Sequence, residues 1–391
     1  MLKKILSLTL LFLVFNVKSQ NVQLSVFSEV SIITSGPGDN LYEKFGHTAI
    51  RVKDPVLNLD LLYNYGIFDF DAPNFYLNFT KGFMKYKLAS YPFHYSLKSA
   101  NEDKRWVKQQ VLNLTQEEKT AIFYFLQSNA QPENASYFYD PFFNNCATKP
   151  RDIIQKILGD KLIIKDNLFK EKKSFRQLMN QEINMSTWGS FGINIALGSK
   201  LDKITSPEER MYLPDYVFEV LASAKILREG NEVNLVKNTK ILLDFEEKQS
   251  KSDLLSPFLT FLILMIIGGF ITYKDYTNNK RTRWLDVSLF FITGLIGSLI
   301  LFLWFFTNHS TAPNNFNFLW AFAPNLIVSF FLTKRNLKSW VFKYVLFLML
   351  LLTVIPFVWV SGIQLFTWQL IPFWNLLLLR YWYLFKLKSF E

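Results

Sequence analysis

Cysteine and histidine are the residue types that this chain has least of. Its 391 residues include one cysteine, Cys146, and three histidines. A single cysteine excludes an internal disulfide, and the histidines are too scattered to match the ligand spacing of a metal site. We therefore expect no metal and no other cofactor. Internal repeats and low-complexity tracts are also missing, which argues against a repeat architecture.

The basic excess of the chain does not indicate nucleic-acid binding. The formal net charge is +11, yet residues 20–253 carry 29 basic and 29 acidic side chains. The excess lies in the first 19 and the last 138 residues, where apolar runs are longest. Half of all residues are hydrophobic and 17% are aromatic, with 40 phenylalanines, which is more apolar than an ordinary soluble domain. These patterns indicate a membrane protein with a neutral central domain.

The first residues have the pattern of a secretory signal peptide. Residues 1–19 combine a positively charged start, an apolar core of about eleven residues and small residues before Gln20. Such a core is too short to cross a bilayer comfortably. We therefore expect this segment to direct residues 20–253 across the membrane. A free thiol in that oxidising compartment calls for a function.

Long apolar runs dominate the chain after residue 253. They cover residues 255–273, 285–307, 316–332, 341–360 and 365–383. Each is near the length that crosses a bilayer. Lysine and arginine occupy the loops after the first and third run and the tail, but not the loops after the second and fourth. Five spans after an exported domain place every basic loop in the cytoplasm. The sequence therefore predicts an all-α bundle of five helices over residues 254–391, in the inner membrane.

Residues 20–253 read as one α+β domain. The alternation of apolar residues predicts strands over residues 22–33, 48–53, 59–70 and 237–245. Thr115 and Glu118 form a capping-box pattern at the start of a helix. A further apolar helix is expected from residue 212 to residue 227.

Cys146 is expected at the beginning of a helix. It follows an aromatic, turn-like run and precedes an apolar helical pattern that ends at Gly159. The unpaired N–H groups and the dipole at a helix start favour negative charge, which lowers the pKa of a thiol and favours the nucleophilic thiolate. His47 follows Gly46 where the strand 48–53 begins. A lone thiol and a histidine are the minimum requirement of a cysteine enzyme, although each residue could instead be structural.

Three sequence blocks carry a resemblance to a known family. They are Phe45-Gly46-His47-Thr48-Ala49-Ile50-Arg51-Val52, Tyr63-Asn64-Tyr65-Gly66-Ile67-Phe68-Asp69-Phe70 and Asn144-Asn145-Cys146-Ala147-Thr148-Lys149-Pro150-Arg151-Asp152. With an exported domain before a multi-span region, the chain resembles the Lnb family of Bacteroidota-type lipoprotein N-acyltransferases. Its order of histidine before cysteine is also similar to the permuted papain-like fold of NlpC-type hydrolases and lecithin:retinol acyltransferase, so a permuted papain-like exported domain is expected.

The resemblance implies an acyltransferase with Cys146 as its nucleophile. His47 would take the thiol proton, and Cys146 would attack an ester carbonyl of a membrane phospholipid to form a thioester. The acyl chain would then pass to the N-terminal amine of a diacylated lipoprotein. The expected partners are therefore a phospholipid donor and a lipoprotein acceptor, with the catalytic domain in the periplasm.

A third residue should orient His47. Asn64, on the strand 59–70 that follows the His47 strand, is the first candidate, and Asp69 is the second. The backbone N–H of Cys146 is a candidate oxyanion donor. Four residues that flank the motifs are candidates for supporting roles: Asn145, Arg51, Arg151 and Glu43. Local ion pairs are the simpler interpretation of the charged ones, although Arg151 could instead meet a phosphate.

Two other classes of function fit parts of the pattern. A membrane-tethered cysteine peptidase or amidase acting on peptidoglycan would use the same Cys–His pair with water as acceptor. Five spans exceed what a tether needs, and a phenylalanine-rich domain suits lipid better than a polymer of sugar and peptide. A non-catalytic envelope scaffold is the other alternative, which the isolated thiol disfavours.

Overall fold

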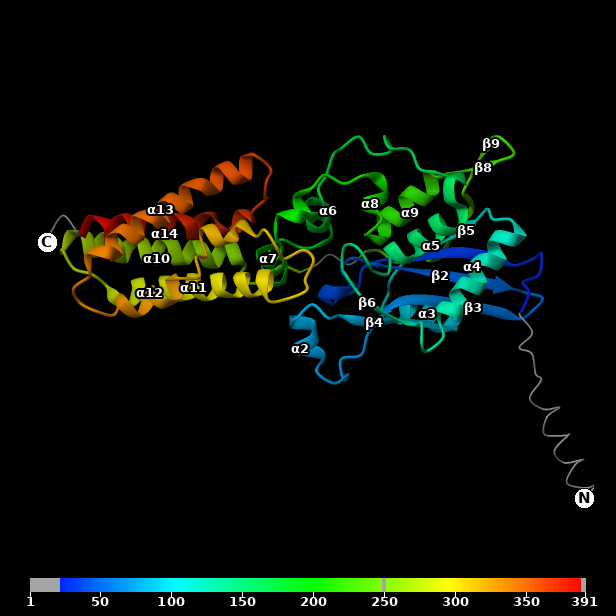
Figure 1. Ribbon diagram of the computed structural model, residues 1–391, viewed down its shortest axis with the longest axis horizontal. Coiled ribbons are helices and arrows are strands. Elements are labelled where there is room, and N and C mark those ends of the chain that lie inside the picture. Colours follow the sequence, from blue (N-terminus) through cyan, green and yellow to red (C-terminus); the bar gives the residue numbers. More distant parts are fainter. Residues whose placement is uncertain (1–21, 248–250, 388–391) are drawn as a thin grey trace, which may run out of the picture.

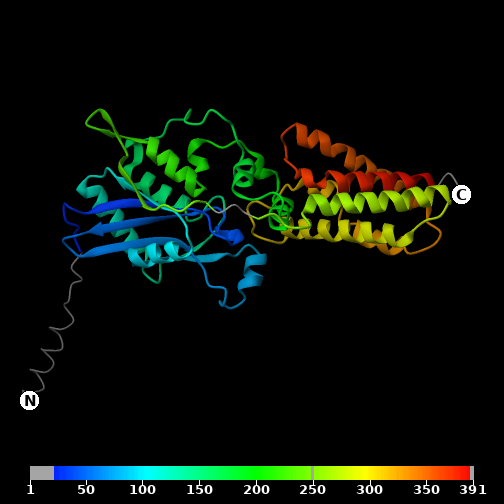
Figure 2. The same cartoon turned by 180° about the vertical axis from the view of Figure 1, so that it is seen from behind.

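The computed structural model describes residues 22–247 and 251–387. The signal peptide expected at residues 1–19 lies outside the described residues. The described chain forms two parts along its long axis, an α+β part followed by a helical part (Figure 1). Figure 2 shows the same two parts from behind, joined through the loops between them. The predicted order of an α+β domain followed by a helical region is confirmed.

A seven-stranded antiparallel sheet is the centre of the α+β part. Its strand order is β10-β5-β1-β2-β3-β4-β6. The strands are β1 (Glu29–Ser35), β2 (His47–Asp54), β3 (Leu59–Ile67), β4 (Lys85–Pro92), β5 (Val107–Leu112), β6 (Ser136–Phe138) and β10 (Val236–Leu243). The register sets Ile32 of β1 opposite Ile50 of β2, and Ile50 opposite Tyr63 of β3. These three buried residues therefore share one face of the sheet.

Helices cover both faces of the sheet. Successive residues of a strand point to opposite faces, so each strand contributes side chains to both layers. The face of Ile32, Ile50 and Tyr63 packs against α4, α5 and α9. The other face, with Ala49 and Leu62, packs against α3. These helices are α3 (Phe93–Glu102), α4 (Gln116–Asn129), α5 (Thr148–Leu158) and α9 (Pro214–Ser223). At α4 the predicted capping box is confirmed, since Thr115 accepts from the Glu118 N–H and Glu118 from the Thr115 N–H.

Shorter elements surround this core. They are η1 (Leu41–Glu43), α2 (Phe75–Thr80), η2 (Gly159–Lys161), β7 (Leu162–Ile163), α6 (Phe175–Glu182), α7 (Trp188–Ala196), η3 (Ser199–Asp202), α8 (Pro207–Arg210), β8 (Lys225–Arg228) and β9 (Asn231–Asn234). Two expectations are corrected here. The first strand begins only at Glu29, because the segment before it is held to Asp54 through Ser25 instead of pairing in the sheet. The helix expected to reach residue 227 ends at Ser223, and the chain continues as β8.

The helical part contains five α-helices of unequal length among its described residues. They are α10 (Pro257–Thr277), α11 (Arg283–Phe305), α12 (Asn325–Phe331), α13 (Ser339–Val360) and α14 (Ile371–Lys386), with 3-10 turns η4 (Phe316–Leu319) and η5 (Trp368–Leu370). Of these, α10, α11 and α13 are long and apolar enough to cross a membrane. Three of the five predicted spanning helices are therefore found among the described residues, and the third and fifth apolar runs form only shorter helices.

Proline explains why those two runs are not long helices. The third run holds η4, then Pro324 directly before the seven-residue α12. Seven helical residues rise only about 10 Å, against about 30 Å for the hydrocarbon core of a bilayer. Pro372 lies at the start of α14, where it is tolerated but prevents the helix from extending backward. The resulting sixteen residues rise about 24 Å.

Both short segments nevertheless connect the two ends of the helical part. Beside the α+β part, Asn315 donates to Ile195 O at 2.7 Å, and Gln369 donates to Met185 O. At the opposite end, Arg281 donates to Leu332 O at 2.7 Å. Tyr383 at the end of α14 bonds Lys280 O at that same end. The basic loops thus gather at the end far from the α+β part.

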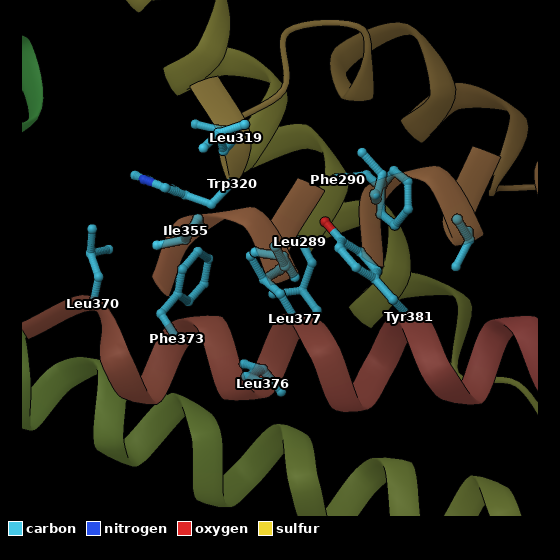
Figure 3. Packing of buried hydrophobic residues seen from close by; sticks show 14 of the residues in the cluster. Leu289, Phe290, Leu319, Trp320, Ile355, Leu370, Phe373, Leu376, Leu377 and Tyr381 are labelled. Atoms are coloured by element: carbon cyan, nitrogen blue, oxygen red, sulfur yellow. The ribbon is translucent and has the colours of Figure 1, made fainter. Parts of the chain in front are cut away.

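The helices pack around large apolar side chains and small contact residues. Figure 3 shows Leu377 and Tyr381 of α14 pointing toward Leu289 and Phe290 of α11. The rings of Tyr381 and Phe290 lie 5.4 Å apart. Gly297 of α11 packs directly on the segment before α12, since a methyl group there would lie 2.0 Å from the carbonyl oxygen of Ala321. Small residues at such contacts let membrane helices approach closely.

Backbone hydrogen bonds fasten the two parts together. The N–H of Gly198 donates to Thr311 O at 2.8 Å, and the N–H of Ser199 donates to Asn314 O at 3.0 Å. Both acceptors lie in the loop between α11 and η4. The N–H of Asn308 in the same loop donates to Lys81 O at 2.8 Å. This loop, residues 306–315, is called the outer loop below. It sets the position of the α+β part on the end of the helical part.

Candidate functional site

Cys146 lies in the turn that leads into α5, as the sequence predicts. The neighbouring Asn145 caps this helix, because its Oδ1 accepts the N–H groups of Ala147 and Thr148, both at 2.9 Å. Its Nδ2 donates to the carbonyl oxygen of Tyr212 at 2.8 Å. Asn145 is buried while Cys146 is half-buried. The asparagine therefore holds the turn rigidly and leaves the thiol accessible.

His47 occupies the first position of β2, next to the end of β3. The antiparallel register that sets Ile50 opposite Tyr63 brings the start of β2 to the end of β3. There Asn64 Oδ1 accepts a hydrogen bond from His47 Nε2 at 2.6 Å. Asn64 in turn donates from Nδ2 to the hydroxyl of Tyr91 at 2.7 Å. The amide thus fixes the ring of His47 and leaves its other nitrogen for a second partner.

That second partner is Cys146. Burial favours the neutral thiol, but the charge of His47 and a hydrogen bond from it outweigh burial, so the pKa of Cys146 is lowered. The N–H groups of Thr48 and of Cys146 itself also point to the sulfur. Burial would likewise lower the pKa of His47, yet the thiolate of Cys146 and the hydrogen bonds that His47 donates to Cys146 and Asn64 outweigh it, and the pKa is raised. The two shifts favour a thiolate–imidazolium pair.

A glycine and two tyrosines form the wall beside the thiol. Gly66 has φ +98°, and a methyl group on it would lie 3.7 Å from the Cβ of Cys146 and 3.8 Å from the ring of Tyr139. A side chain there would be strained by this backbone conformation. Tyr139 stacks on Tyr86 of β4, with ring centroids 4.4 Å apart. The wall therefore continues from the thiol along β4.

The two acidic candidates do not contact His47. Asp69 is exposed in the loop after β3, and its Oδ1 accepts the N–H of Asp71 at 2.9 Å. Glu43 accepts the N–H of Asn40 at 3.1 Å and lies 3.9 Å from Arg105. Both carboxylates stabilise loops. Of the two residues considered for orienting His47, Asn64 is the one that touches it.

The two arginines form local ion pairs. Arg51 makes a bidentate pair with Asp60, with both distances 2.7 Å, and its guanidinium lies over the ring of Phe93 at 3.9 Å. It therefore supports the sheet and does not reach the thiol. Arg151 pairs with Asp152 at 2.7 Å on the first turns of α5.

One polar contact near the site was not expected from the sequence. Asp140 precedes the Cys146 turn, and its Oδ1 accepts the N–H groups of Phe142 and Phe143 at 2.9 and 3.0 Å. Its Oδ2 accepts the hydroxyl of Ser310 in the outer loop. The turn that carries the thiol is thereby bonded to the helical part. The only sequence signal was the short aspartate turn pattern, which does not identify so distant a partner.

The arrangement has the groups required for covalent acyl chemistry. Cys146 offers a nucleophile, His47 can move a proton to and from it, and Asn64 holds His47 in one orientation. The backbone N–H of Cys146 remains the candidate oxyanion donor. Among the residues that the structure describes, no group of three His, Cys, Asp or Glu side chains is placed to hold a metal ion.

Comparison with known proteins gives two matches to family models. The model described as the Lnb N-terminal periplasmic domain matches residues 17–181. The model described as the Lnb transmembrane domain matches residues 248–389. Together they cover most of the chain, and the first includes His47, Asn64 and Cys146. No curated protein and no solved structure matches the chain.

Proposed function

Because the chain belongs to the Lnb family, we propose that it transfers an acyl chain from a membrane phospholipid to the N-terminal amine of a lipoprotein. The two domains make it a membrane protein with a periplasmic domain, and the family indicates a role in lipoprotein maturation. The proposal adds the reaction, its nucleophile and its two substrates. It continues the expectation drawn from the sequence motifs.

The observation that carries the proposal is the chain of contacts from Asn64 through His47 to Cys146. Asn64 holds the imidazole at 2.6 Å, and the imidazole lowers the pKa of the thiol. Asp140 bonds the turn before this thiol to Ser310 at the end of the helical part. An activated thiol beside membrane helices suits a lipid donor, since both substrates would share one leaflet.

In the first step, the Cys146 thiolate attacks an ester carbonyl of the phospholipid. A C–S bond forms, the ester C–O bond breaks, and the imidazolium of His47 gives its proton to the departing oxygen. The products are a thioester on Cys146 and a lysophospholipid. The N–H group of Cys146 is the candidate donor to the oxyanion formed on the way.

In the second step, the α-amine of a diacylglyceryl-modified cysteine attacks the thioester. A C–N bond forms and the C–S bond breaks, while His47 accepts the proton that the amine loses. The thiolate–imidazolium pair is restored. The amide product is the N-acylated lipoprotein.

For the membrane topology, we propose five crossings with three long helices and two interrupted segments. The hydrogen bonds of Asn315 and Arg281 lie at opposite ends of the third segment. The hydrogen bonds of Gln369 and Tyr383 lie at opposite ends of the fifth segment. Irregular backbone at membrane depth is tolerated where protein surrounds it. With the α+β domain in the periplasm, the basic loops then face the cytoplasm of an inner-membrane, multi-pass protein.

The reaction is tested with the purified full chain, phospholipid and a diacylglyceryl-cysteine lipopeptide. Mass spectrometry should find lipopeptide heavier by one acyl chain, and Cys146→Ala should abolish the gain. His94→Ala is the matched control for His47→Ala, because His94 is exposed on α3. His94→Ala should retain activity, and His47→Ala should lose it.

Each other result has a defined meaning. Release of free fatty acid without acylated lipopeptide would make water the acceptor and the protein a hydrolase. A mass gain that survives Cys146→Ala would exclude this cysteine as nucleophile. No product from a folded chain with any phospholipid would favour a non-catalytic role.

A further inference from the structure

The loop between β3 and β4 encloses a pocket that the two steps above do not use. Its volume is about 310 Å³, which is at the lower end of the range of small-molecule sites. It is bounded by residues 67–79 on one side and by the start of β4 on the other. Several of its lining residues are exposed, so the pocket opens to the surface along one side.

Five of the fourteen residues that line this pocket are aromatic, and four more are apolar. The ring of Phe68 lies 4.9 Å from that of Tyr86 and 6.0 Å from that of Phe75. Phe79 and Phe83 complete the aromatic wall. The aromatic and apolar residues offer dispersion contacts to a hydrocarbon, while polar side chains line the rest of the pocket. Its chemistry therefore fits an aliphatic chain better than a sugar or a peptide.

The pocket adjoins the ends of the membrane helices. Figure 1 and Figure 2 both place α2 beside the outer loop. The Asn308 N–H of that loop donates to Lys81 O just after α2, and the His309 ring lies 6.5 Å from that of Phe79. Tyr76 on α2 is 72% exposed and Phe306 after α11 is 73% exposed. Exposed aromatic side chains are typical of the membrane–water interface.

The other end of the pocket reaches the wall beside Cys146. Tyr86 lines the pocket and stacks on Tyr139 at 4.4 Å. Ile67 lines it as well, directly after Gly66, whose open side faces the thiol. A series of ring contacts therefore leads from His309 of the outer loop to Tyr139 in the wall beside Cys146.

We propose that this pocket binds one acyl chain of the phospholipid donor, with its ester carbonyl at Cys146. The inference rests on the proposed function and names the part of the site that selects the donor. The chain would slide in from the outer leaflet past α2. Lys85 and Lys87 are exposed among the lining residues, so positive charge is available for the lipid phosphate.

The first test compares donors of different chain length with the full chain. Ala72→Trp places a large ring in the pocket, and intact-mass spectrometry measures the acyl group on Cys146 from hexadecanoyl and hexanoyl phospholipids. Each methylene of the acyl chain that loses its contact should lower labelling about fourfold. The loss of two such contacts should lower the ratio of long-chain to short-chain labelling about fifteenfold. Phe75→Ala, which widens the pocket, should change the same ratio while leaving the backbone of α2 intact.

Two matched controls keep this test specific. Val56→Trp adds the same ring to an exposed turn at the opposite end of β2 and β3, and Phe27→Ala removes an exposed phenylalanine far from the pocket. Both should keep the unmodified ratio. Equal loss with both donors in Ala72→Trp and Phe75→Ala would overturn the pocket, because a general distortion would then explain the loss.

The second test does not depend on catalysis. Cys146→Ala protein is mixed with phosphatidylethanolamine whose acyl chain carries a diazirine, irradiated and digested. Cross-links to residues 67–87 that disappear in Ala72→Trp would support the pocket, whereas cross-links confined to the lipid-facing helices would overturn it. Cross-links in the pocket without any thioester in unmodified protein would retain the lipid site and reject the proposed reaction.

Discussion

His47 Nε2 lies 2.6 Å from Asn64 Oδ1, across two neighbouring strands of one sheet. The distance is that of a strong hydrogen bond, and Tyr91 holds the far side of the same amide at 2.7 Å. An amide oxygen in this position keeps a proton on Nε2. The other nitrogen of the ring is then free to exchange a proton with Cys146.

Removal of that oxygen should slow catalysis more than it destabilises the fold. Asn64→Ala leaves His47 without its orienting partner, and we expect acyl-enzyme formation to fall about a hundredfold. Tyr91→Phe removes only the support of the amide and should cost about tenfold or less. Single-turnover formation of the thioester is the measurement. If Tyr91→Phe proves more harmful than Asn64→Ala, the amide does not act through His47.

The reactivity of Cys146 should extend below the ordinary titration range of a thiol. Because its pKa is lowered and that of His47 is raised, the thiolate persists to lower pH than in the denatured chain and is lost as pH falls through the lowered value. Alkylation by iodoacetamide should therefore persist below pH about 8.5, where the denatured chain reacts poorly. The chain has one cysteine, so the label reports this site alone.

The same titration separates the two members of the pair. His47→Ala should move the midpoint of alkylation upward, toward the denatured value or above it, since burial is then opposed only by the N–H groups of Thr48 and Cys146. His94→Ala should leave the midpoint in place. Acyl transfer needs both charged forms and should decline on either side of a plateau. An unmoved alkylation midpoint in His47→Ala would show that the imidazole does not activate the thiol.

The bond between Asp140 and Ser310 should contribute to the stability of the site. Asp140→Ala removes two bonds to the backbone and one to Ser310, a loss of about 2–3 kcal/mol. Ser310→Ala removes one bond and should cost about 1 kcal/mol. Thermal unfolding of the detergent-solubilised chain gives the order of the two effects. Equal midpoints for both variants would mean that the backbone bonds of Asp140 add little.

Arg380 should be among the residues of the helical part least tolerant of substitution. It is buried and lies 2.8 Å from Asp275 and 2.5 Å from Asp286. Arg380→Met removes the guanidinium that pairs with these two buried carboxylates, which should cost about 3–5 kcal/mol and lower the thermal midpoint. Adding Asp275→Asn and Asp286→Asn to this variant should restore part of the lost stability and raise the thermal midpoint again.

A matched change elsewhere distinguishes this network from general loss of charge. Lys343→Met removes an exposed cation from α13 and should leave the midpoint nearly unchanged. Should Arg380→Met unfold no earlier than Lys343→Met, the buried ion pairs would not be what joins α10, α11 and α14.

Features encoded by local pattern could be predicted from the sequence. The position of Cys146 before a helix followed from the apolar spacing of that helix and its glycine end. Thr115 and Glu118 identified the start of α4 because a capping box lies within four residues. Asn64 was a reasonable partner for His47 because neighbouring strands bring their side chains close together.

Features that depend on distant partners, or on where an apolar helix is interrupted, could not be predicted from the sequence. Ser310 meets Asp140 across 170 residues, and no local pattern records such a contact. The third apolar run looked like a span because hydropathy measures composition, whereas Pro324 and the polar residues around it decide whether the helix is continuous. The strand β5 (Val107–Leu112) was overlooked because two glutamines and a lysine interrupt its apolar alternation.

The position of β10 at one edge of the sheet has a consequence for biogenesis. This strand pairs with β5 and ends at Leu243, shortly before α10 begins at Pro257. Until it emerges, the edge of β5 has open backbone groups that could pair with another chain. The sheet is thus completed only when almost the whole periplasmic domain has been translocated and the first membrane helix is about to insert. Folding of the periplasmic domain and anchoring in the bilayer are therefore coupled in time, and a chain arrested before β10 would leave the edge of β5 open.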